Sequence, residues 1–306
     1  MQFVILLLCF CLSFGLSASV HAGGVGSMEE MTASRSDTLL NIAREHGLGF
    51  TEIRAANPGV DPWLPGEGTD VILPKWHLFP DAPQKGIVIN LAEMRLYYFP
   101  ESRDEAPRSF PIGIGREGFD TPLGETKVSW KRPNPSWTPT PSMREDNPDL
   151  PQTVPPGPDN PLGSHAVYLG WPAYLMHGTD KPWGIGRRVS SGCIRLYPED
   201  IKQLYALAEK GMPVRVVDQP VKLAWIESAL YMEVHPPVEQ AISFERQGDA
   251  PIYNVPKGFL AWLTDTVGER KKHEIDWALI HKVLRERRGY PVKIYDVSNY
   301  ADRVLR

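Results

Sequence analysis

Cysteine is scarce in this chain, with three among 306 residues. Cys9 and Cys11 lie in an N-terminal apolar run, and Cys193 stands far from both. If that run is removed on export, one thiol remains, so a disulfide within the chain is excluded. An isolated thiol in an oxidising compartment is either buried as a small apolar group or used chemically. The residues around Cys193 decide between these two interpretations.

A basic excess is also lacking, because 33 Lys and Arg face 37 Asp and Glu, for a net charge of −4. Nucleic-acid-binding domains normally carry such an excess, so no nucleic-acid partner is expected. Closely paired metal ligands are lacking too. One cysteine with the scattered His165, His177 and His235 does not have the spacing of a structural zinc site. We therefore expect no metal.

The N-terminal apolar run from Phe3 to Leu16 has no charged residue before Glu29. It is short for a membrane span, which needs about 20 residues, and it suits a secretory signal peptide. Val20-His21-Ala22 offers a cleavage site, so we expect residues 1–22 to be removed. The run lacks Lys and Arg near its start, which leaves an uncleaved anchor as the alternative. Residues 23–33 are Gly-rich and polar, and a linker is predicted there.

A small unit is predicted over residues 34–75. Its first helix has apolar residues at helical spacing after an N-cap at Ser36 or Asp37. A second short helix over 51–56 and a strand over 71–74 complete the unit. About 40 residues are too few for an enzyme core, so the unit is interpreted as a binding module.

Strand-like runs dominate the next part of the chain, which predicts a mainly β fold with some α. The runs cover residues 87–90, 95–99, 110–114, 127–130, 166–169, 174–177 and 214–217. The stretch over 131–164, rich in Pro, Asn and Asp, is too long for an ordinary connection and is predicted to be a functional lid. A helix is predicted over 198–210. Beyond it, helical spacing recurs over 277–287 and a strand is predicted over 292–295.

Residues suited to acyl transfer by a thiol stand close together in the sequence, at His177-Gly178 and at Ser190-Ser191-Gly192-Cys193-Ile194-Arg195. This chemistry needs a thiolate, a base, a group that orients the base, and donors for a developing oxyanion. His177 is the candidate base, and the backbone N–H groups of Gly192 and Cys193 are candidate donors. Arg195 favours the thiolate or holds a substrate carboxylate. The structural alternatives are an idle thiol, a histidine used in packing, and an Arg195 paired with Glu199 or Asp200.

The same residues resemble the active-site signature of the L,D-transpeptidase family, whose catalytic domain is of the YkuD type. The resemblance covers about residues 85–218 and includes the motifs at 87–93, 111–115, 121–124 and 132–140. Within the family, the chain is most similar to the Gram-negative periplasmic branch that anchors an outer-membrane lipoprotein to peptidoglycan. Residues 34–75, with Asn57-Pro58-Gly59, resemble a LysM module. Residues 219–306 remain as a C-terminal extension of unknown role.

The resemblance implies a β-sandwich-like catalytic domain behind a small α+β LysM-like module, and no cofactor. It implies that the thiolate attacks the carbonyl of the L-centre of the diamino acid at stem-peptide position 3, and that D-Ala leaves. The implied catalytic residues are the nucleophile Cys193, the base His177, Gly178 with the carbonyl that orients it, and Gly192, which forms the oxyanion hole with Cys193. The residues expected to contact substrate are Arg195, Ser190, Ser191 and Trp137.

The implied partners are peptidoglycan stem peptides and glycan, and the implied location is the periplasm. A lipoprotein lysine, a second diamino acid or water would accept the acyl group, giving anchoring, a 3–3 cross-link or carboxypeptidase and endopeptidase action. The alternatives from other classes are a non-catalytic peptidoglycan-binding protein, a sortase-like enzyme and a zinc amidase. Sortase-like enzymes separate Cys and Arg widely, whereas Cys193 and Arg195 are two residues apart.

Overall fold

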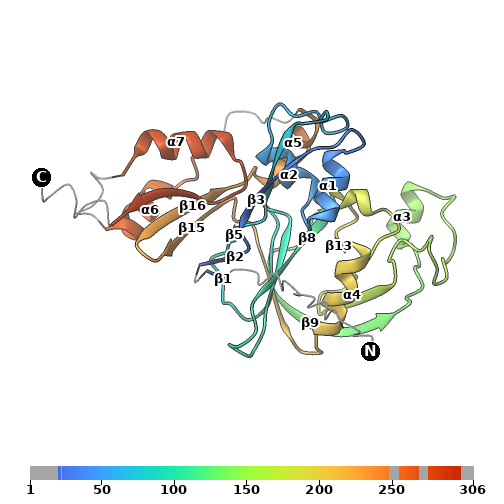
Figure 1. Ribbon diagram of the computed structural model, residues 1–306. Coiled ribbons are helices and arrows are strands. Elements are labelled where there is room, and N and C mark those ends of the chain that lie inside the picture. Colours follow the sequence, from blue (N-terminus) through green and yellow to red (C-terminus); the bar gives the residue numbers. More distant parts are fainter. Residues whose placement is uncertain (1–19, 22, 248–254, 269–274, 298–306) are drawn as a thin grey trace, which may run out of the picture.

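The computed structural model describes residues 20–21, 23–247, 255–268 and 275–297. Figure 1 shows a central β domain, with the N-terminal module against one side and a C-terminal unit beside both. The predicted signal peptide lies outside the described residues, except for β1 (Val20–His21). β1 pairs with β2 (Gly24–Val25), which pairs in turn with β5 (His77–Leu78).

The N-terminal module packs two short helices on a two-stranded antiparallel sheet. Its elements are α1 (Leu39–Glu45), α2 (Phe50–Ala56), β3 (Met28–Thr32) and β4 (Asp70–Pro74). Its small core is built from Leu39, Ile42, Leu48, Ile53, Val71 and Leu73. The two predicted helices and the predicted strand over 71–74 are confirmed.

Two details predicted for this module are wrong. The N-cap of α1 is Thr38, whose hydroxyl accepts a hydrogen bond from the N–H of Asn41. Asp37 instead accepts from the backbone N–H of Ser34, so it closes the preceding turn. The predicted linker over 23–33 contains β3, whose five residues all pair with β4. Glu29 lies on the half-buried face of β3 and forms an ion pair of 2.8 Å with Lys75, whereas Glu30 faces outward.

The central domain is one nine-stranded sheet. Its strands are β6 (Gly86–Asn90), β7 (Arg95–Phe99), β8 (Arg108–Gly115), β9 (Gly124–Pro133), β10 (His165–Leu169), β11 (Leu175–His177), β12 (Arg188–Ser190), β13 (Ile194–Leu196) and β14 (Pro213–Val217). Their order is β12-β8-β13-β11-β10-β9-β14-β6-β7, and β7 also pairs with β8. The predicted mainly β fold is confirmed, but the strands close into one ring instead of forming the two separate sheets of a sandwich.

Both faces of β6 and β7 are buried, which explains the consecutive apolar residues over 87–89 and 96–99. Ile87 and Ile89 point into the main core, where Ile201 and Leu204 of α4 (Pro198–Leu207) also pack. Val88 packs on the other face with residues of the N-terminal segment. The predicted helix over 198–210 ends early, because Ala208 is extended and its N–H caps the last turn. The remaining helical segments of the domain are α3 (Pro141–Asp146) and η1 (Pro182–Gly184).

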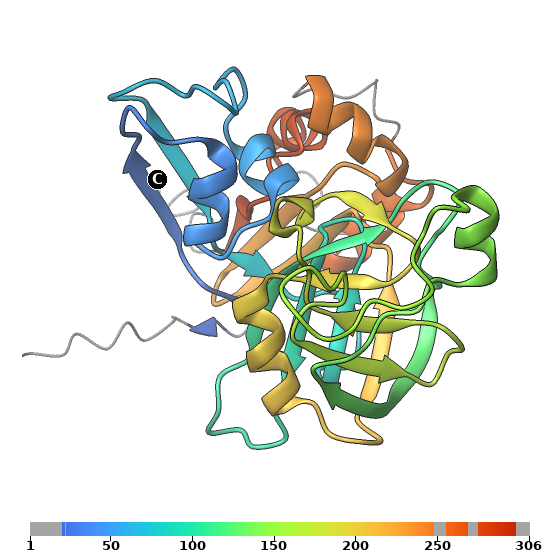
Figure 2. The same cartoon turned by 90° about the vertical axis from the view of Figure 1, so that its right-hand side faces the viewer.

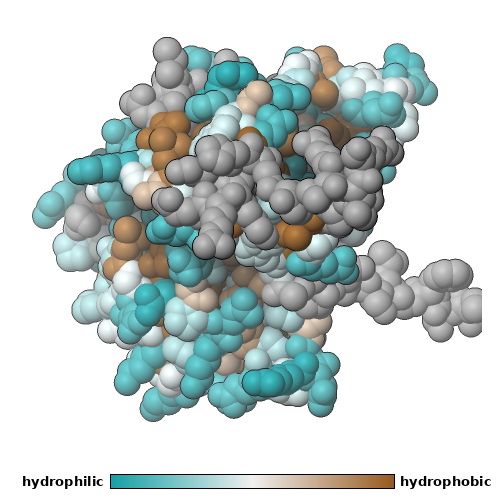
Figure 3. Space-filling view, turned by 90° about the vertical axis from the view of Figure 1, so that its left-hand side faces the viewer, coloured by the Kyte–Doolittle hydropathy of each residue, from teal (hydrophilic) through white to brown (hydrophobic). Residues whose placement is uncertain are grey.

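The C-terminal unit has its own apolar core, so it is a separate packing unit. Its elements are β15 (Val221–Ile226), β16 (Ala229–Val234), α6 (Phe259–Val267), α7 (Trp277–Glu286) and β17 (Val292–Asp296). Between β16 and α6, η2 (Val238–Gln240) and α5 (Ala241–Gln247) pack instead on the main core, through Val238 and Ala241. The predicted helix over 277–287 and strand over 292–295 are confirmed. Figure 3 looks onto this side of the molecule, where apolar patches lie among polar atoms. No helix in the described ranges has the length and apolar character needed to cross a membrane.

A buried network of charges joins the three parts. Lys222 of β15 lies between two carboxylates, with its Nζ 2.6 Å from Glu93 Oε2 and 2.9 Å from Glu233 Oε1. Glu93 belongs to the β6–β7 turn, and Glu233 also accepts a hydrogen bond of 2.6 Å from the N–H of Leu78. His77, Glu93 and Glu233 have the mutual spacing of metal ligands, but the Lys222 ammonium already supplies the cation between the two carboxylates.

Removing this cation is expected to destabilise the whole assembly. Lys222→Met removes the ammonium shared by two buried carboxylates, which are left with hydrogen bonds from groups such as Tyr97 and His235, and this costs on the order of 3–5 kcal/mol. The melting temperature should therefore fall by several degrees in thermal unfolding followed by circular dichroism. Lys293→Met is the matched control, because Lys293 pairs with Asp296 at 3.0 Å on the surface, and surface pairs contribute about 0–1 kcal/mol. Equal melting temperatures for the two variants would contradict the assignment.

Candidate active site

Pairing of four neighbouring strands sets the candidate residues in two rows across one face of the sheet. Arg132 pairs with Ala166, Ala166 with His177, and His177 with Arg195. In the adjacent row Trp130 pairs with Tyr168, and Tyr168 pairs with Leu175. Because Met176 pairs with Ile194 in the parallel β11–β13 register, the residues just before them, Leu175 and Cys193, also lie side by side. Side chains two residues apart on a strand share a face, so both rows face the same side.

A cleft of about 630 Å³ lies over this face. Its lining includes Cys193, His177, Arg195, Ser190, Ser191, Trp137 and Tyr168. The structure therefore brings the predicted side chains together around one cleft, and adds Tyr168 to them. The two predicted glycines, Gly178 and Gly192, are the chain neighbours of His177 and Cys193. Because the two segments are joined through the parallel β11–β13 pair, they meet although 15 residues separate His177 from Cys193.

The turn that carries Cys193 is fixed by two hydroxyl groups. Ser190 Oγ donates a hydrogen bond of 2.5 Å to the carbonyl of Cys193, and Thr121 Oγ1 donates one of 2.9 Å to the carbonyl of Gly192. Gly192 has a φ of +96°, and a Cβ there would lie 3.0 Å from the ring of Tyr174. Only glycine meets both conditions without strain. Ser190 thus donates its hydroxyl proton within the turn while it also lines the cleft, and its role as a substrate contact stays a prediction.

His177 is held as a neutral base. Its Nδ1 lies 2.5 Å from the carbonyl of Gly178, so Nδ1 carries the proton and Nε2 is left to accept one. Burial, together with the positive charge of Arg195, lowers the pKa of His177 to about 3. The imidazole is therefore unprotonated at any pH above about 4. The Gly178 carbonyl works against this shift by favouring the charged ring.

The thiol of Cys193 has opposing influences on its pKa. Burial raises the pKa, while the backbone N–H of Leu175 and the charge of Arg195 lower it. Burial has the largest effect, so the resting pair is a neutral thiol and a neutral imidazole. The expectation that Arg195 favours the thiolate is right in sign, but Arg195 alone does not outweigh burial. The thiol also lies 3.5 Å from the carbonyl of Ala173, a residue with φ +66°.

Arg195 has a buried Nε without a hydrogen-bond partner among the described residues. The alternative pairing with Glu199 is wrong, because Glu199 forms an ion pair of 2.9 Å with Arg44 of the N-terminal module. Asp200 Oδ2 is likewise buried with no partner in the described ranges, so it does not pair with Arg195 either. A guanidinium that lines the cleft with a donor unused is suited to an anionic group of a ligand.

The segment over 131–164 supplies part of the cleft lining, including Trp137, Thr140 and Leu162. Figure 2 shows its green chain, with α3, beside the strands of the sheet. Trp137 and Val154 exchange backbone hydrogen bonds of 2.9 and 2.8 Å across this segment. Asn160 is fully buried and donates to the carbonyls of Pro135, Val154 and Pro155. Asn160 therefore fastens both ends of the segment, a role that the sequence reasoning missed because one Asn among many carries no signal.

The comparisons with known proteins agree with this geometry. Residues 84–216 match the family described as YkuD, the L,D-transpeptidase catalytic domain. The protein of Escherichia coli K12 named Probable L,D-transpeptidase YbiS is 39% identical over 279 residues, which cover 88% of each chain. The chain belongs to the L,D-transpeptidase family. Two further E. coli K12 relatives carry the same description: YcfS, 45% identical over 69% of this chain and 68% of its own, and ErfK/SrfK, 39% identical over 84% and 82%.

Among solved structures, L,D-transpeptidase 3 from Mycobacterium tuberculosis overlaps 65% of this chain and 93% of its own. Its sequence identity is 20% and the TM-score is 0.34, an overlap too weak to support a structural argument. The prediction that the chain is an L,D-transpeptidase is thus confirmed by sequence relatives.

The N-terminal module of the transpeptidase touches the loop between its base and its nucleophile. The N–H groups of Phe50 and Thr51 donate to the carbonyls of Ile185 and Gly186 at 3.2 Å, and Thr51 Oγ1 donates to Gly186 at 2.6 Å. A Cβ on Gly186 would lie 2.2 Å from the N of Phe50, so glycine is required for this approach. No local sequence pattern indicates this contact, because it depends on tertiary packing alone.

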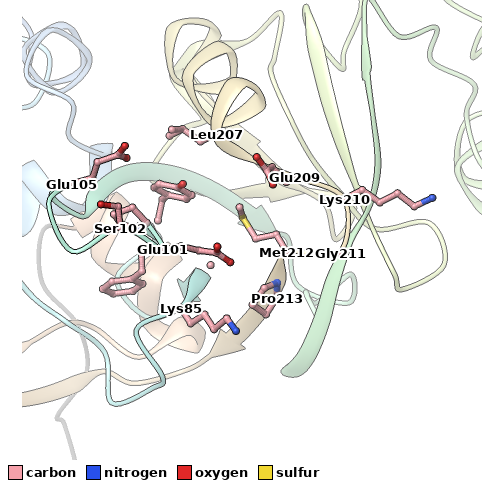
Figure 4. Close-up of a pocket in the computed structure, with 14 residues that line it drawn as sticks. Lys85, Glu101, Ser102, Glu105, Leu207, Glu209, Lys210, Gly211, Met212 and Pro213 are labelled. Atoms are coloured by element: carbon pink, nitrogen blue, oxygen red, sulfur yellow. The ribbon is translucent and has the colours of Figure 1, made fainter.

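A second pocket of about 490 Å³ lies at the other end of the catalytic domain. Figure 4 shows Glu101, Glu105 and Glu209 around it, with Lys85 at its edge. Neither a cysteine nor a histidine lines this pocket. It therefore lacks both the nucleophile and the base of a transpeptidase, and the cleft at Cys193 is the candidate active site.

The electrostatic role of Arg195 can be tested by titration. Its positive charge lowers the pKa of both His177 and Cys193, so Arg195→Gln should raise both. NMR of the imidazole should show His177 titrating at higher pH, and the pH dependence of alkylation by iodoacetamide should show the thiol ionising at higher pH. Lys181→Gln, which removes an exposed charge from the same loop, is the control. Opposite shifts of the two groups would contradict this account.

Proposed function

We propose that the protein is a periplasmic peptidoglycan L,D-transpeptidase that works through a thioester on Cys193. The observation that supports this most is the buried His177, whose Nδ1 is bound to the Gly178 carbonyl while its ring lies in the cleft beside the only cysteine of the described residues. A base held in one tautomer next to a thiol is the arrangement that nucleophilic acyl transfer requires.

The proposed first step forms the acyl-enzyme. His177 Nε2 takes the proton of Cys193, and the sulfur attacks the carbonyl of the L-centre of the diamino acid at stem-peptide position 3. The N–H groups of Gly192 and Cys193 receive the developing oxyanion. The C–N bond to D-Ala then breaks, the proton returns from His177 to the leaving amine, and a thioester remains on Cys193.

The second step transfers the acyl group to an amine. The amine attacks the thioester carbonyl and loses its proton to His177, which returns it to the released thiolate. Arg195 is assigned to a carboxylate of the substrate because its guanidinium lines the cleft with an unused buried donor. Ser191 and Trp137 line the same cleft and are assigned to contacts along the stem peptide.

The rest of the chain is assigned to recognition and export. Residues 34–75 are proposed to be a LysM-like module that binds glycan, and residues 1–22 to be a signal peptide. A lipoprotein lysine is the first candidate acceptor and a second diamino acid, giving a 3–3 cross-link, is the next. Water, giving a carboxypeptidase or endopeptidase, ranks third. The competing function is a non-catalytic peptidoglycan-binding protein. The Gly178 carbonyl holds His177 in one tautomer, and the Ser190 hydroxyl fixes the turn at Cys193. Both features argue against a binding protein, which needs neither.

The nucleophile can be tested with a carbapenem, which mimics the stem-peptide amide and acylates thiols. Intact-mass measurement should show one adduct on the mature protein, located by peptide mapping at Cys193. Cys193→Ala should give none, and His177→Ala should slow acylation by about 10²–10⁴-fold. Glycan binding by residues 34–75 should stay unchanged in both variants. An adduct that survives Cys193→Ala would overturn the assignment.

The acceptor can be identified from the cell wall itself. Peptidoglycan from cells with and without the gene is digested to muropeptides, which are analysed by mass spectrometry. Loss of lipoprotein-linked species is the expected result, because lipoprotein anchoring ranks first. Loss of 3–3 dimers alone would move the assignment to cross-linking, and a rise in tetrapeptides with no loss of either product would move it to hydrolysis.

A further inference from the structure

Tyr168, which forms part of the cleft wall, is stacked on a second aromatic ring, that of Trp130. Trp130 and Tyr168 lie with ring centroids 3.7 Å apart and planes 6° from parallel. Tyr168 lines the cleft, whereas the Trp130 side chain is among the exposed large apolar groups, with 45% of its surface accessible. One face of the indole is therefore covered by Tyr168, and an exposed aromatic surface remains next to the part of the cleft wall that Tyr168 forms.

The strand register places this surface in line with the thiol. Trp130, Tyr168 and Leu175 are consecutive pairing partners, and the β11–β13 register puts Cys193 next in the row. Three steps between neighbouring strands of about 4.8 Å separate the ends of the row, about 14 Å in all. The backbone N–H of Leu175, inside the row, already contacts the Cys193 thiol.

From this alignment we propose that Trp130, backed by Tyr168, is a platform for a sugar ring of the glycan strand that carries the donor stem peptide. The proposal rests on the proposed function. The lactyl group and three residues link the sugar to the carbonyl that Cys193 attacks, and four such units span at most about 14 Å. The reach of the peptide thus matches the length of the row. The C–H face of a sugar ring packs on an aromatic face as other apolar surfaces do.

The parallel row supports the same orientation of the donor. Arg132 and Arg195 lie at the two ends of this row, so a peptide bound along the row from Trp130 to Cys193 would have a cationic group beside each of its ends. Stem peptides carry free carboxylates, which suit such a border. This platform is distinct from the N-terminal module, because Trp130 belongs to β9 of the catalytic domain. It would make the enzyme prefer stem peptides that are still attached to glycan.

The test compares two donors, a free tetrapeptide and the same tetrapeptide on its disaccharide, with no separate amine acceptor added. The readout is the first equivalent of D-Ala released per Cys193 as the thioester forms, and KM here means the donor concentration that gives half of the maximal acylation rate. The wild-type protein should have a lower KM for the disaccharide form. Trp130→Ala should raise that KM on the order of tenfold, and should leave the KM for the free tetrapeptide and the rate of carbapenem acylation unchanged. Trp130→Phe should keep most of the preference, because it keeps a flat ring.

Trp183→Ala is the matched control, since Trp183 is 52% exposed and lies in η1, outside the row. An unchanged preference in Trp130→Ala would overturn the proposal. So would an equal rise in KM for both donors, which would mean that Trp130 only supports Tyr168. An effect that appears only after an amine acceptor is added would assign the platform to the acceptor instead. Carbapenem acylation of Cys193 is measured in parallel, so a failure of the proposed function is seen separately.

Discussion

The parallel pairing of β11 with β13 is the contact on which the cleft depends. It is only two residues long on each strand, yet it sets His177 beside Arg195 and Leu175 beside Cys193. This pairing also positions the neighbouring backbone of the site, because Gly178 directly follows β11 and the turn with Gly192 directly precedes β13. Such a short pairing is supported by β10 and β8 on its two outer edges, and by Met176 and Ile194, which are fully buried in the main core on its other face. The hydrophobic core thus fixes the distance between base and nucleophile.

The protein keeps charges in two very different surroundings. Where its parts meet, the positive charge of Lys222 is balanced by the carboxylates of Glu93 and Glu233. The cost of burying these charges is offset by the ion pairs among them. In the cleft, His177 and Cys193 are also shielded from water, but Arg195 has no compensating carboxylate within ion-pair distance among the described residues. The first arrangement holds the fold together. The second leaves the positive charge of Arg195 without an adjacent counter-charge in the described part of the chain, and an anionic group of the substrate can supply one.

Local sequence signals predicted much of this molecule. The β6–β7 hairpin, the helix after Cys193 and the residues of the cleft were all within reach, because apolar alternation, Pro and Gly punctuation and the family signature act over short stretches. The closed ring of strands, the hydrogen bonds of Asn160 to the segment over 131–164 and the hydrogen bond from Ser190 to the Cys193 carbonyl were not. Each of these arises from contacts between segments that are distant in the sequence. No local pattern distinguishes the polar residue that makes such a contact from other polar residues of similar length.

The approach of Gly49 to Gly186 has a consequence for how this protein can change over time. A Cβ on Gly49 would lie 2.8 Å from the Cα of Gly186, so neither position accepts a side chain unless the other segment moves. The ion pairs Arg44–Glu199 and Arg95–Glu52 bind the same two parts together. The N-terminal module and the catalytic domain must therefore be inherited as one block. Exchanging the module for that of a relative would require matching changes in the loop that leads to Cys193.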